Sequence, residues 1–143
     1  MKYYFAYGSN LWRHQMQERC PEHQVYGLGS LNNYRWIISL RGVANIIKSK
    51  GDRVFGIVYM ISLQDEERLD ECEGVDEGCY TKETLPVDVN GASLDCLVYE
   101  DPIEEKGSPR AKYISKINMG IADAALPQDY VNRYIRMYIP MES

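Results

Sequence analysis

Short runs in which hydrophobic and polar residues alternate, rich in Val, Ile and Tyr, occupy most of the chain, with turn residues about every ten positions. This pattern predicts strands, because the side chains of a strand point alternately to the two faces of a sheet. Turns are expected at Gly51 with its neighbours Lys50 and Asp52, and at Asn90 with Gly91, which is the strongest short hairpin signal. The expected strands are residues 3–7, 24–31, 34–40, 44–48, 53–61, 81–89 and 93–99.

One helix is well marked between these strands. Ser62 followed three positions later by Asp65 resembles a capping box, in which each residue binds the backbone of the other. The helix is therefore expected to run from Leu63 to about Cys72, and Gly74 is placed to end it.

Three further helices are expected. A short helix over residues 11–18 follows a Gly-Ser-Asn turn in which Asn10 is placed to cap it. Another starts at Ser108 with Pro109 in its first turn, and the last opens at Pro127. The hydrophobic stripes are Ile114, Ile117 and Ile121 on the former, and Tyr130, Val131, Tyr134, Ile135 and Tyr138 on the latter.

These elements predict a single domain of the α+β class over residues 1–143, in which a mainly antiparallel sheet of seven strands closes into a barrel. A chain of this length buries enough surface for a real core. The polar segment over residues 100–107 is the best candidate for a mobile loop or lid hinge.

Composition limits the kinds of molecule that this chain is expected to bind. The net charge is −5 and the Lys and Arg residues are scattered, which argues against a nucleic-acid partner, since phosphate binding needs a basic stripe. No hydrophobic run is long enough to span a membrane, and the first residues do not resemble a signal peptide, so a cytoplasmic location is expected.

Four cysteines, Cys20, Cys72, Cys79 and Cys96, are spaced without a CxxC motif. A zinc site is therefore not expected, and the four are interpreted as reduced, mostly buried thiols. No serine lies in a GxSxG context, so a serine hydrolase is poorly supported.

Two segments could carry chemistry. In the first, a strand runs directly into Gly8, Ser9 and Asn10, which would leave successive backbone N–H groups unpaired and ready to bind a carboxylate or a developing oxyanion. A plain turn with a helix cap would use the same residue types, and both interpretations stay open.

The second segment is the acidic end of the helix over residues 63–72. Asp70 and Glu73 are three positions apart and would share one helical face near the negative end of the helix dipole. Both effects disfavour the ionised carboxylate. A carboxyl group in this setting that is also partly buried should have a raised pKa, which would suit a general base near neutral pH. Because other acidic residues crowd this region, a solvated acidic face is the alternative.

Taken in order, these segments resemble the gamma-glutamylcyclotransferase family over nearly the whole chain. The resemblance lies in YGSNL at residues 7–11, VFGIVY at 54–59, LDECEGV at 69–75 followed by Tyr80, SPRAKY at 108–113, MGIA at 119–122 and LPQDY at 126–130. Any one of these matches would be weak evidence, but matches in order along the chain are a strong signal.

The resemblance implies a small mixed, mainly antiparallel barrel with flanking helices. It also implies an enzyme of the acyltransferase or lyase type, linked to glutathione-related metabolism, which needs no metal or cofactor. Such an enzyme cleaves a small gamma-glutamyl amide by attack of the substrate's own α-amine on the γ-carbonyl, and releases 5-oxoproline and an amino acid or amine. The implied site comprises Glu73 as the acid/base, Tyr7, Gly8, Ser9, Asn10, Leu11 and Trp12 as the binder of the gamma-glutamyl group, and Tyr113 as a further substrate contact.

Other readings stay open. A relative of the same fold could act on a gamma-glutamylamine or on a gamma-glutamylated metabolite, because Trp12 stands where some relatives have a smaller side chain. A non-catalytic module that only binds a gamma-glutamyl ligand would keep the same loop. A self-associating structural protein, for example a homodimer, would rest on the Tyr and Ile stripe near residue 135.

Overall fold

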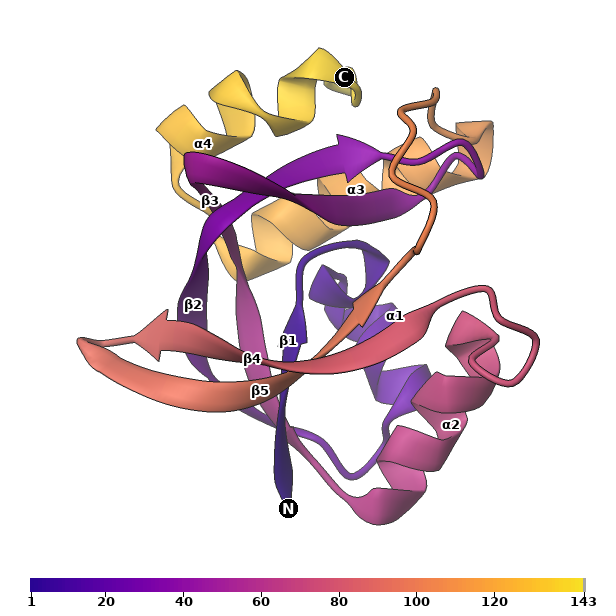
Figure 1. The fold of residues 1–143 in the computed structure, drawn as a ribbon, viewed down its shortest axis with the longest axis vertical. Helices are drawn as coiled ribbons and strands as arrows, with labels where there is room; N and C mark the ends of the chain where they lie inside the picture. Colours follow the sequence, from indigo (N-terminus) through magenta and orange to yellow (C-terminus); the bar gives the residue numbers. More distant parts are fainter. Residues whose placement is uncertain (143) are drawn as a thin grey trace.

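The computed structural model describes residues 1–142, and its strands close into a barrel (Figure 1). The strands follow the order β1, β3, β2, β4, β5 around the barrel. Neighbouring strands are antiparallel except β1 and β5, which are parallel, so the barrel is mixed and mainly antiparallel, as predicted. The strands are β1 (Lys2–Ala6), β2 (Gln24–Ile38), β3 (Ala44–Ile61), β4 (Thr81–Val89) and β5 (Ala92–Glu100).

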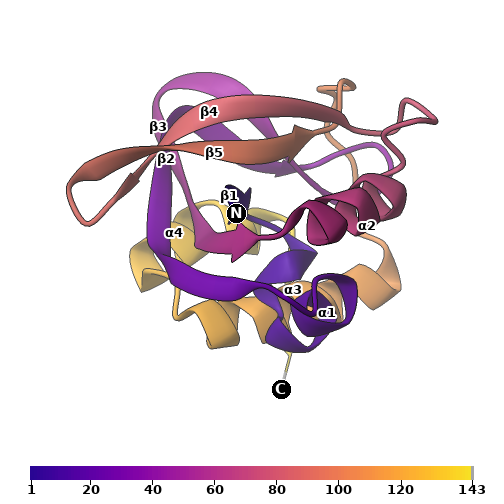
Figure 2. The same cartoon turned by 90° about the horizontal axis from the view of Figure 1, so that it is seen from below.

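The helices lie outside the barrel. In Figures 1 and 2, α1 and α2 lie close together beside the barrel, whereas α3 and α4 lie near β2 and β3. The predicted class, α+β with flanking helices, is therefore confirmed. The helices are α1 (Arg13–Arg19), α2 (Leu63–Glu73), α3 (Ala111–Ala124) and α4 (Gln128–Arg133), with two 3-10 helices, η1 (Ser9–Leu11) and η2 (Ile135–Met137).

The prediction of seven strands was wrong. Two expected strands form the single strand β2, and two others form the single strand β3. In the ladder between β2 and β3, Asn32 pairs with Arg53 and the next pair is Tyr34 with Lys48. The residues around Gly51, predicted as a turn between two strands, therefore form a bulge inside β3. Turn residues are also typical of bulges, so the sequence correctly marked an irregular backbone here but not the type of irregularity.

The best-marked local signals are confirmed. The Ser62 hydroxyl accepts a hydrogen bond from the Asp65 N–H at 3.1 Å, and the Asp65 carboxylate accepts one from the Ser62 N–H at 3.3 Å. Gly74 ends α2 in the left-handed conformation, with φ of 63°. Val89 pairs with Ala92, so β4 and β5 are joined by the predicted two-residue turn.

The first and third helices begin later than predicted. The cap of α1 is Trp12, because η1 precedes it and the Asn10 side chain is bound elsewhere. The cap of α3 is Arg110, which is extended, and its N–H donates to the Gly42 carbonyl at 3.1 Å. This tertiary hydrogen bond holds the Ser108–Pro109 segment against a neighbouring loop instead of letting it enter the helix.

The hydrophobic stripe near the C-terminus packs into the protein's own core. Tyr130 and Val131 on α4, Tyr134 after it and Ile135 on η2 are all buried. The helix predicted from Pro127 is shorter than expected and continues as η2. These four residues of the stripe are therefore covered within the chain, whereas Tyr138 is half-buried, and a homodimer stays a prediction.

The segment over residues 100–107 is anchored to the end of β2 and the start of β3. Asp101 is buried, its N–H donates to Asn45 Oδ1 at 2.9 Å, and Asn45 Nδ2 donates to the Asp101 carbonyl at 3.1 Å. At the other end, the Gly107 N–H donates to the Ile38 carbonyl at 2.8 Å. A lid role for this segment stays a prediction.

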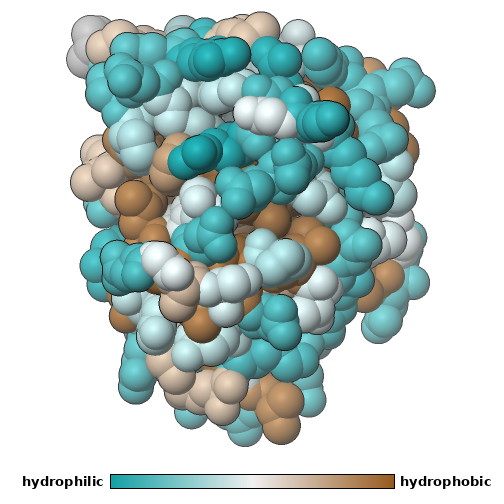
Figure 3. All heavy atoms as spheres, turned by 60° about the vertical axis from the view of Figure 1, so that its left-hand side comes forward, coloured by the Kyte–Doolittle hydropathy of each residue, from teal (hydrophilic) through white to brown (hydrophobic). Residues whose placement is uncertain are grey.

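The thiols are all free, but only two of the four are buried. Cys20 and Cys96 are buried as predicted, whereas Cys79 is half-buried and Cys72 is exposed. On the face drawn in Figure 3, hydrophobic residues reach the surface in patches between hydrophilic ones. Within residues 1–142, no helix is both long and hydrophobic enough to cross a membrane.

Candidate active site

A cavity of about 530 Å³ lies where the chain leaves β1, where α2 ends and where α3 begins. Its volume is in the range of ordinary small-molecule pockets. It joins the two segments that the sequence analysis singled out. The lining residues are Tyr4, Phe5, Tyr7, Gly8, Ser9, Asn10, Arg19, Val43, Ala44, Cys72, Glu73, Tyr80, Tyr99, Arg110, Ala111, Lys112, Tyr113 and Lys116.

The loop after β1 is held by two long-range hydrogen bonds at Tyr7. The buried Trp36 donates from Nε1 to the Tyr7 carbonyl at 2.9 Å, and the Tyr7 hydroxyl donates to the Tyr99 carbonyl at 2.6 Å. Within the described part of the chain, the N–H groups of Gly8, Ser9 and Asn10 form no hydrogen bond with another backbone group. The Ser9 N–H is turned toward the Tyr113 hydroxyl. The loop thus presents donors that the backbone does not use, as expected of an anion-binding turn.

Asn10 fixes the shape of this loop. Its Nδ2 donates to the Tyr4 hydroxyl at 2.9 Å, and its Oδ1 accepts from Gln15 Nε2 at 2.9 Å and from Arg19 Nη1 at 3.2 Å. The Tyr59 hydroxyl donates to its carbonyl at 2.9 Å. The Asn10 side chain, predicted as a helix cap, therefore ties η1 to β1 and α1.

Leu11 and Trp12 do not line the cavity, unlike the rest of the predicted loop. Leu11 is buried against Gly120 of α3, and the Trp12 ring lies 5.1 Å from the His14 ring. Their N–H groups donate to the carbonyls of Gly8 and Ser9, both at 3.1 Å. The structure therefore places Tyr7, Gly8, Ser9 and Asn10 at the cavity, and Leu11 and Trp12 behind it.

Glu73 lines the same cavity as this loop and is the last residue of α2. Its side chain is only 17% exposed, and Oε1 lies 3.8 Å from Arg19 Nη1. Burial raises the pKa of the Glu73 carboxyl above its ordinary value, and the positive charge of Arg19 opposes this shift. The direction agrees with the sequence prediction, and burial, which that prediction required, is the main cause.

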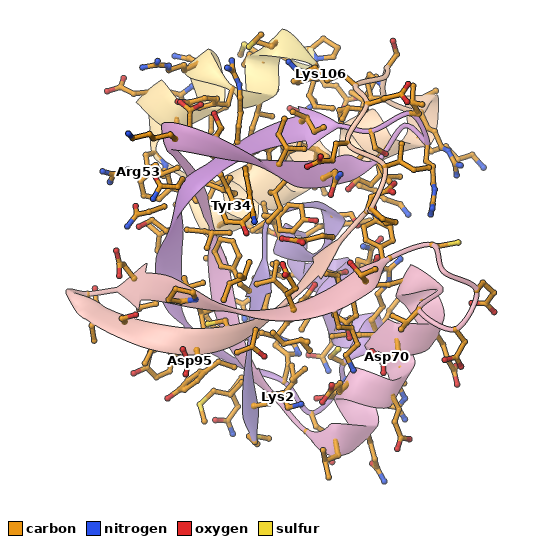
Figure 4. All side chains as sticks on the ribbon, in the orientation of Figure 1. Lys2, Tyr34, Arg53, Asp70, Asp95 and Lys106 are labelled. Carbon is orange, nitrogen blue, oxygen red and sulfur yellow. The ribbon has the colours of Figure 1, made fainter. Side chains whose placement is uncertain are left out.

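Asp70 has a different role from Glu73, although both are on α2. It accepts from the Tyr99 hydroxyl at 2.7 Å and from Lys82 Nζ at 3.0 Å, and it projects from α2 toward β4 and β5 (Figure 4). Lys82 also bonds to Glu66 at 2.6 Å. These contacts fix α2 against the barrel and so position the helix end that carries Glu73.

Two tyrosines, Tyr80 and Tyr113, meet at the backbone of Ala44. The Ala44 N–H donates to the Tyr113 hydroxyl at 3.1 Å, and the Tyr80 hydroxyl donates to the Ala44 carbonyl at 3.1 Å. Burial raises the pKa of Tyr113 to about 12 and raises that of Tyr80 further, and the charge of Glu73 adds to both shifts. Both side chains are therefore neutral hydroxyls at physiological pH. Tyr113, which was predicted as a substrate contact, lines the cavity.

The charge of the cavity is opposite to that of the chain. Four cationic side chains line it, from Arg19, Arg110, Lys112 and Lys116, against one carboxylate, Glu73. A cavity of this kind attracts an anionic ligand. Within residues 1–142, no group of three or more His, Cys, Asp and Glu side chains is arranged to hold a metal ion.

Sequence reasoning missed the cavity residues outside the recognised motifs. Tyr80 and Lys112 lay within or beside the matched segments, so the signal for them was present. Arg19, Tyr4 and Tyr99 had none, because only the closed barrel and the packing of α1 bring them to Glu73 and the N-terminal loop.

Known proteins resemble this chain in both sequence and fold. Residues 53–134 match the AIG2-like family. The chain is 33% identical to gamma-glutamylcyclotransferase of Mus musculus over 138 residues, which covers 89% of this chain and 73% of that protein. The human gamma-glutamylcyclotransferase is 30% identical with the same coverage. A solved gamma-glutamyl cyclotransferase structure superimposes with a TM-score of 0.88 at 27% identity, over 99% of this chain and 90% of the other.

Proposed function

The chain belongs to the gamma-glutamylcyclotransferase (AIG2-like) family, and from that premise we propose that it converts a gamma-glutamyl amide to 5-oxoproline and a free amino acid or amine. The observation that carries this proposal is that one cavity holds the shielded Glu73 carboxyl and the N–H groups of Gly8, Ser9 and Asn10, which form no backbone–backbone hydrogen bond in the described part of the chain. A proton carrier and an anion cradle are the two parts that such a ring closure requires.

The proposed reaction needs no water. The α-nitrogen of the substrate attacks its own γ-carbonyl carbon, a C–N bond forms in a five-membered ring, and the amide C–N bond to the leaving group breaks. Because both reacting atoms belong to one molecule, the enzyme's main task is to hold the substrate in its folded conformation. Correct positioning alone can supply about 7–11 kcal/mol of the barrier.

Glu73 would move the protons. The α-ammonium group must lose one proton to become a nucleophile and a second as the ring closes, and the leaving nitrogen must gain two to depart as an ammonium group. A single carboxylate that accepts and returns protons balances these steps, and a raised pKa favours both directions near neutral pH. Burial of Glu73 supports this role.

The loop would hold the negative charges of the substrate. The N–H groups of Gly8, Ser9 and Asn10, which are not bound to another backbone group in the described residues, would bind the α-carboxylate or the oxyanion that develops on the γ-carbonyl. Tyr113 lies beside Gly8, where its hydroxyl is fixed by the Ala44 N–H and can contact the same group. Cofactor independence, a cytoplasmic location and the leaving group stay predictions.

Arg19 should set the pH range in which Glu73 works as a base. Because the pKa of Glu73 is raised, kcat/KM should fall as the pH drops through that raised value and Glu73 becomes protonated. Arg19→Met removes the charge that holds this pKa down, so the acid limb should move to higher pH. The measurement is the pH profile of kcat/KM for 5-oxoproline formation.

Arg19→Lys keeps the charge and should restore most of the original profile, and Arg13→Met, on the exposed surface of α1, is the matched control. An acid limb that does not move in Arg19→Met would mean that Glu73 is not the group that titrates.

The function itself is tested by incubating the purified protein with a panel of gamma-glutamyl amino acids, gamma-glutamylamines and larger gamma-glutamylated compounds. We expect 5-oxoproline and the free leaving group in equal amounts from at least one of them. The member that reacts identifies the leaving-group class. Tight binding without product across the panel would instead support the non-catalytic binding module.

A further inference from the structure

Three cations line the cavity from the first turns of α3. Arg110 is the cap residue of this helix, and Lys112 and Lys116 are four positions apart, so the two lysines lie on one helical face. Within residues 1–142, none of the three forms an ion pair. This cationic rim, defined as Arg110, Lys112 and Lys116, stands in a chain whose net charge is −5.

The rim is held in place by the backbone around it. The Arg110 N–H donates to the Gly42 carbonyl at 3.1 Å, and α3 packs through Gly120 against Leu11. The positive end of the α3 dipole adds to the side-chain charges at the same place. Like charges that line one cavity repel one another, and a ligand of opposite charge relieves this repulsion.

The gamma-glutamyl part of the substrate does not account for this rim. Its one carboxylate has a separate set of donors, the N–H groups of Gly8, Ser9 and Asn10, with Arg19 on the same side of the cavity. The three rim cations are therefore left for the part of the substrate that departs.

We infer that the leaving group is an acidic amino acid or a short acidic peptide, which the cationic rim selects by charge. This inference rests on the proposed function and adds the substrate class to it. Leaving groups with a net positive charge, such as polyamines, should be disfavoured by the same rim. Neutral leaving groups should fall between the two.

The test compares gamma-glutamyl-glutamate with gamma-glutamyl-glutamine, which have nearly the same shape and differ by one charge, and adds gamma-glutamyl-lysine. At low ionic strength, kcat/KM should be about five- to tenfold higher for the glutamate than for the glutamine compound, and lowest for the lysine compound. In Arg110→Gln/Lys112→Gln/Lys116→Gln, which removes all three rim charges, the ratio of the first two should approach one. Lys50→Gln, on an exposed bulge of β3, is the matched control and should keep the ratio.

Binding separates this inference from the proposed function. Calorimetric titration of the same compounds into Glu73→Gln gives the ratio of Kd values without turnover. The expected ratio in binding with no 5-oxoproline from the native protein would sustain the rim and contradict the proposed reaction. Equal affinity for the glutamate and glutamine compounds, or a preference that survives in the triple variant, would overturn the inference.

Discussion

Glu73→Gln is expected to lower kcat for 5-oxoproline formation by about 10²–10⁴-fold, the usual contribution of a positioned acid/base. Glutamine has almost the same shape as glutamate and can still face Arg19, but it cannot accept a proton from the substrate amine. KM should change little, because the loop and the cationic rim remain. Steady-state kinetics with the best substrate of the panel measures both quantities.

The same substitution should not destabilise the protein. The folded-state pKa of Glu73 is raised, so the folded protein binds this proton more tightly than the unfolded chain. The resulting stabilisation is complete below the unfolded pKa and is lost as the pH rises through the folded value. A neutral glutamine avoids that loss, so thermal unfolding at pH 7 should occur at the same or a higher temperature.

The matched control is Glu71→Gln, two positions earlier on α2, where the side chain is exposed. It removes one negative charge from the same helix and should leave kcat within about twofold of the native value. Undiminished turnover in Glu73→Gln, with Glu71→Gln also active, would remove Glu73 from the reaction and leave the cavity without its proposed base.

The features that the sequence predicted correctly are those with a local physical cause. The capping box at Ser62, the end of α2 at Gly74 and the turn at Asn90 depend on contacts within a few residues, and each is present. The wrong predictions lie where tertiary contacts, and not the local sequence, determine the local structure. The bulge at Gly51 was predicted as a turn between two strands. The pairing that makes β3 one strand comes from β2, which runs beside it on both sides of Gly51, and the local sequence does not show this pairing.

The residues of the candidate site also fall into two groups, those that local motifs indicated and those that only tertiary contacts bring to the cavity. Motif resemblance pointed to Tyr7, Gly8 and Glu73, which the structure brings to one cavity, but it also included Leu11, whose side chain packs against α3 instead. A sequence motif contains residues that pack in the core as well as residues that bind a ligand, and it does not show which side chains face the ligand. Arg19 lies in no recognised motif, because its relevance comes from tertiary contacts, the 3.2 Å hydrogen bond to Asn10 Oδ1 and the 3.8 Å distance to Glu73 Oε1.

The last prediction concerns the close approach at Gly8. A Cβ atom at this position would lie 2.9 Å from the Tyr113 hydroxyl and 3.0 Å from Ala44 Cβ. The hydroxyl cannot simply move away, because it accepts a hydrogen bond from the Ala44 N–H. Gly8→Ala should therefore push the loop out of position and lower kcat/KM by about 10²-fold, since a displacement of about 1 Å can cost that much.

A double variant shows whether this contact is the cause. Tyr113→Phe removes the hydroxyl that the new methyl group would meet, so Gly8→Ala should cost much less in the Tyr113→Phe background than in the native protein. Gly27→Ala is the control, because its Cβ would meet only Val89 Cγ1, at an ordinary 3.4 Å. If Gly8→Ala cost the same in both backgrounds, the loss would come from elsewhere in the loop. The close packing of Gly8 on Tyr113 would then not be what holds the N–H groups toward the substrate.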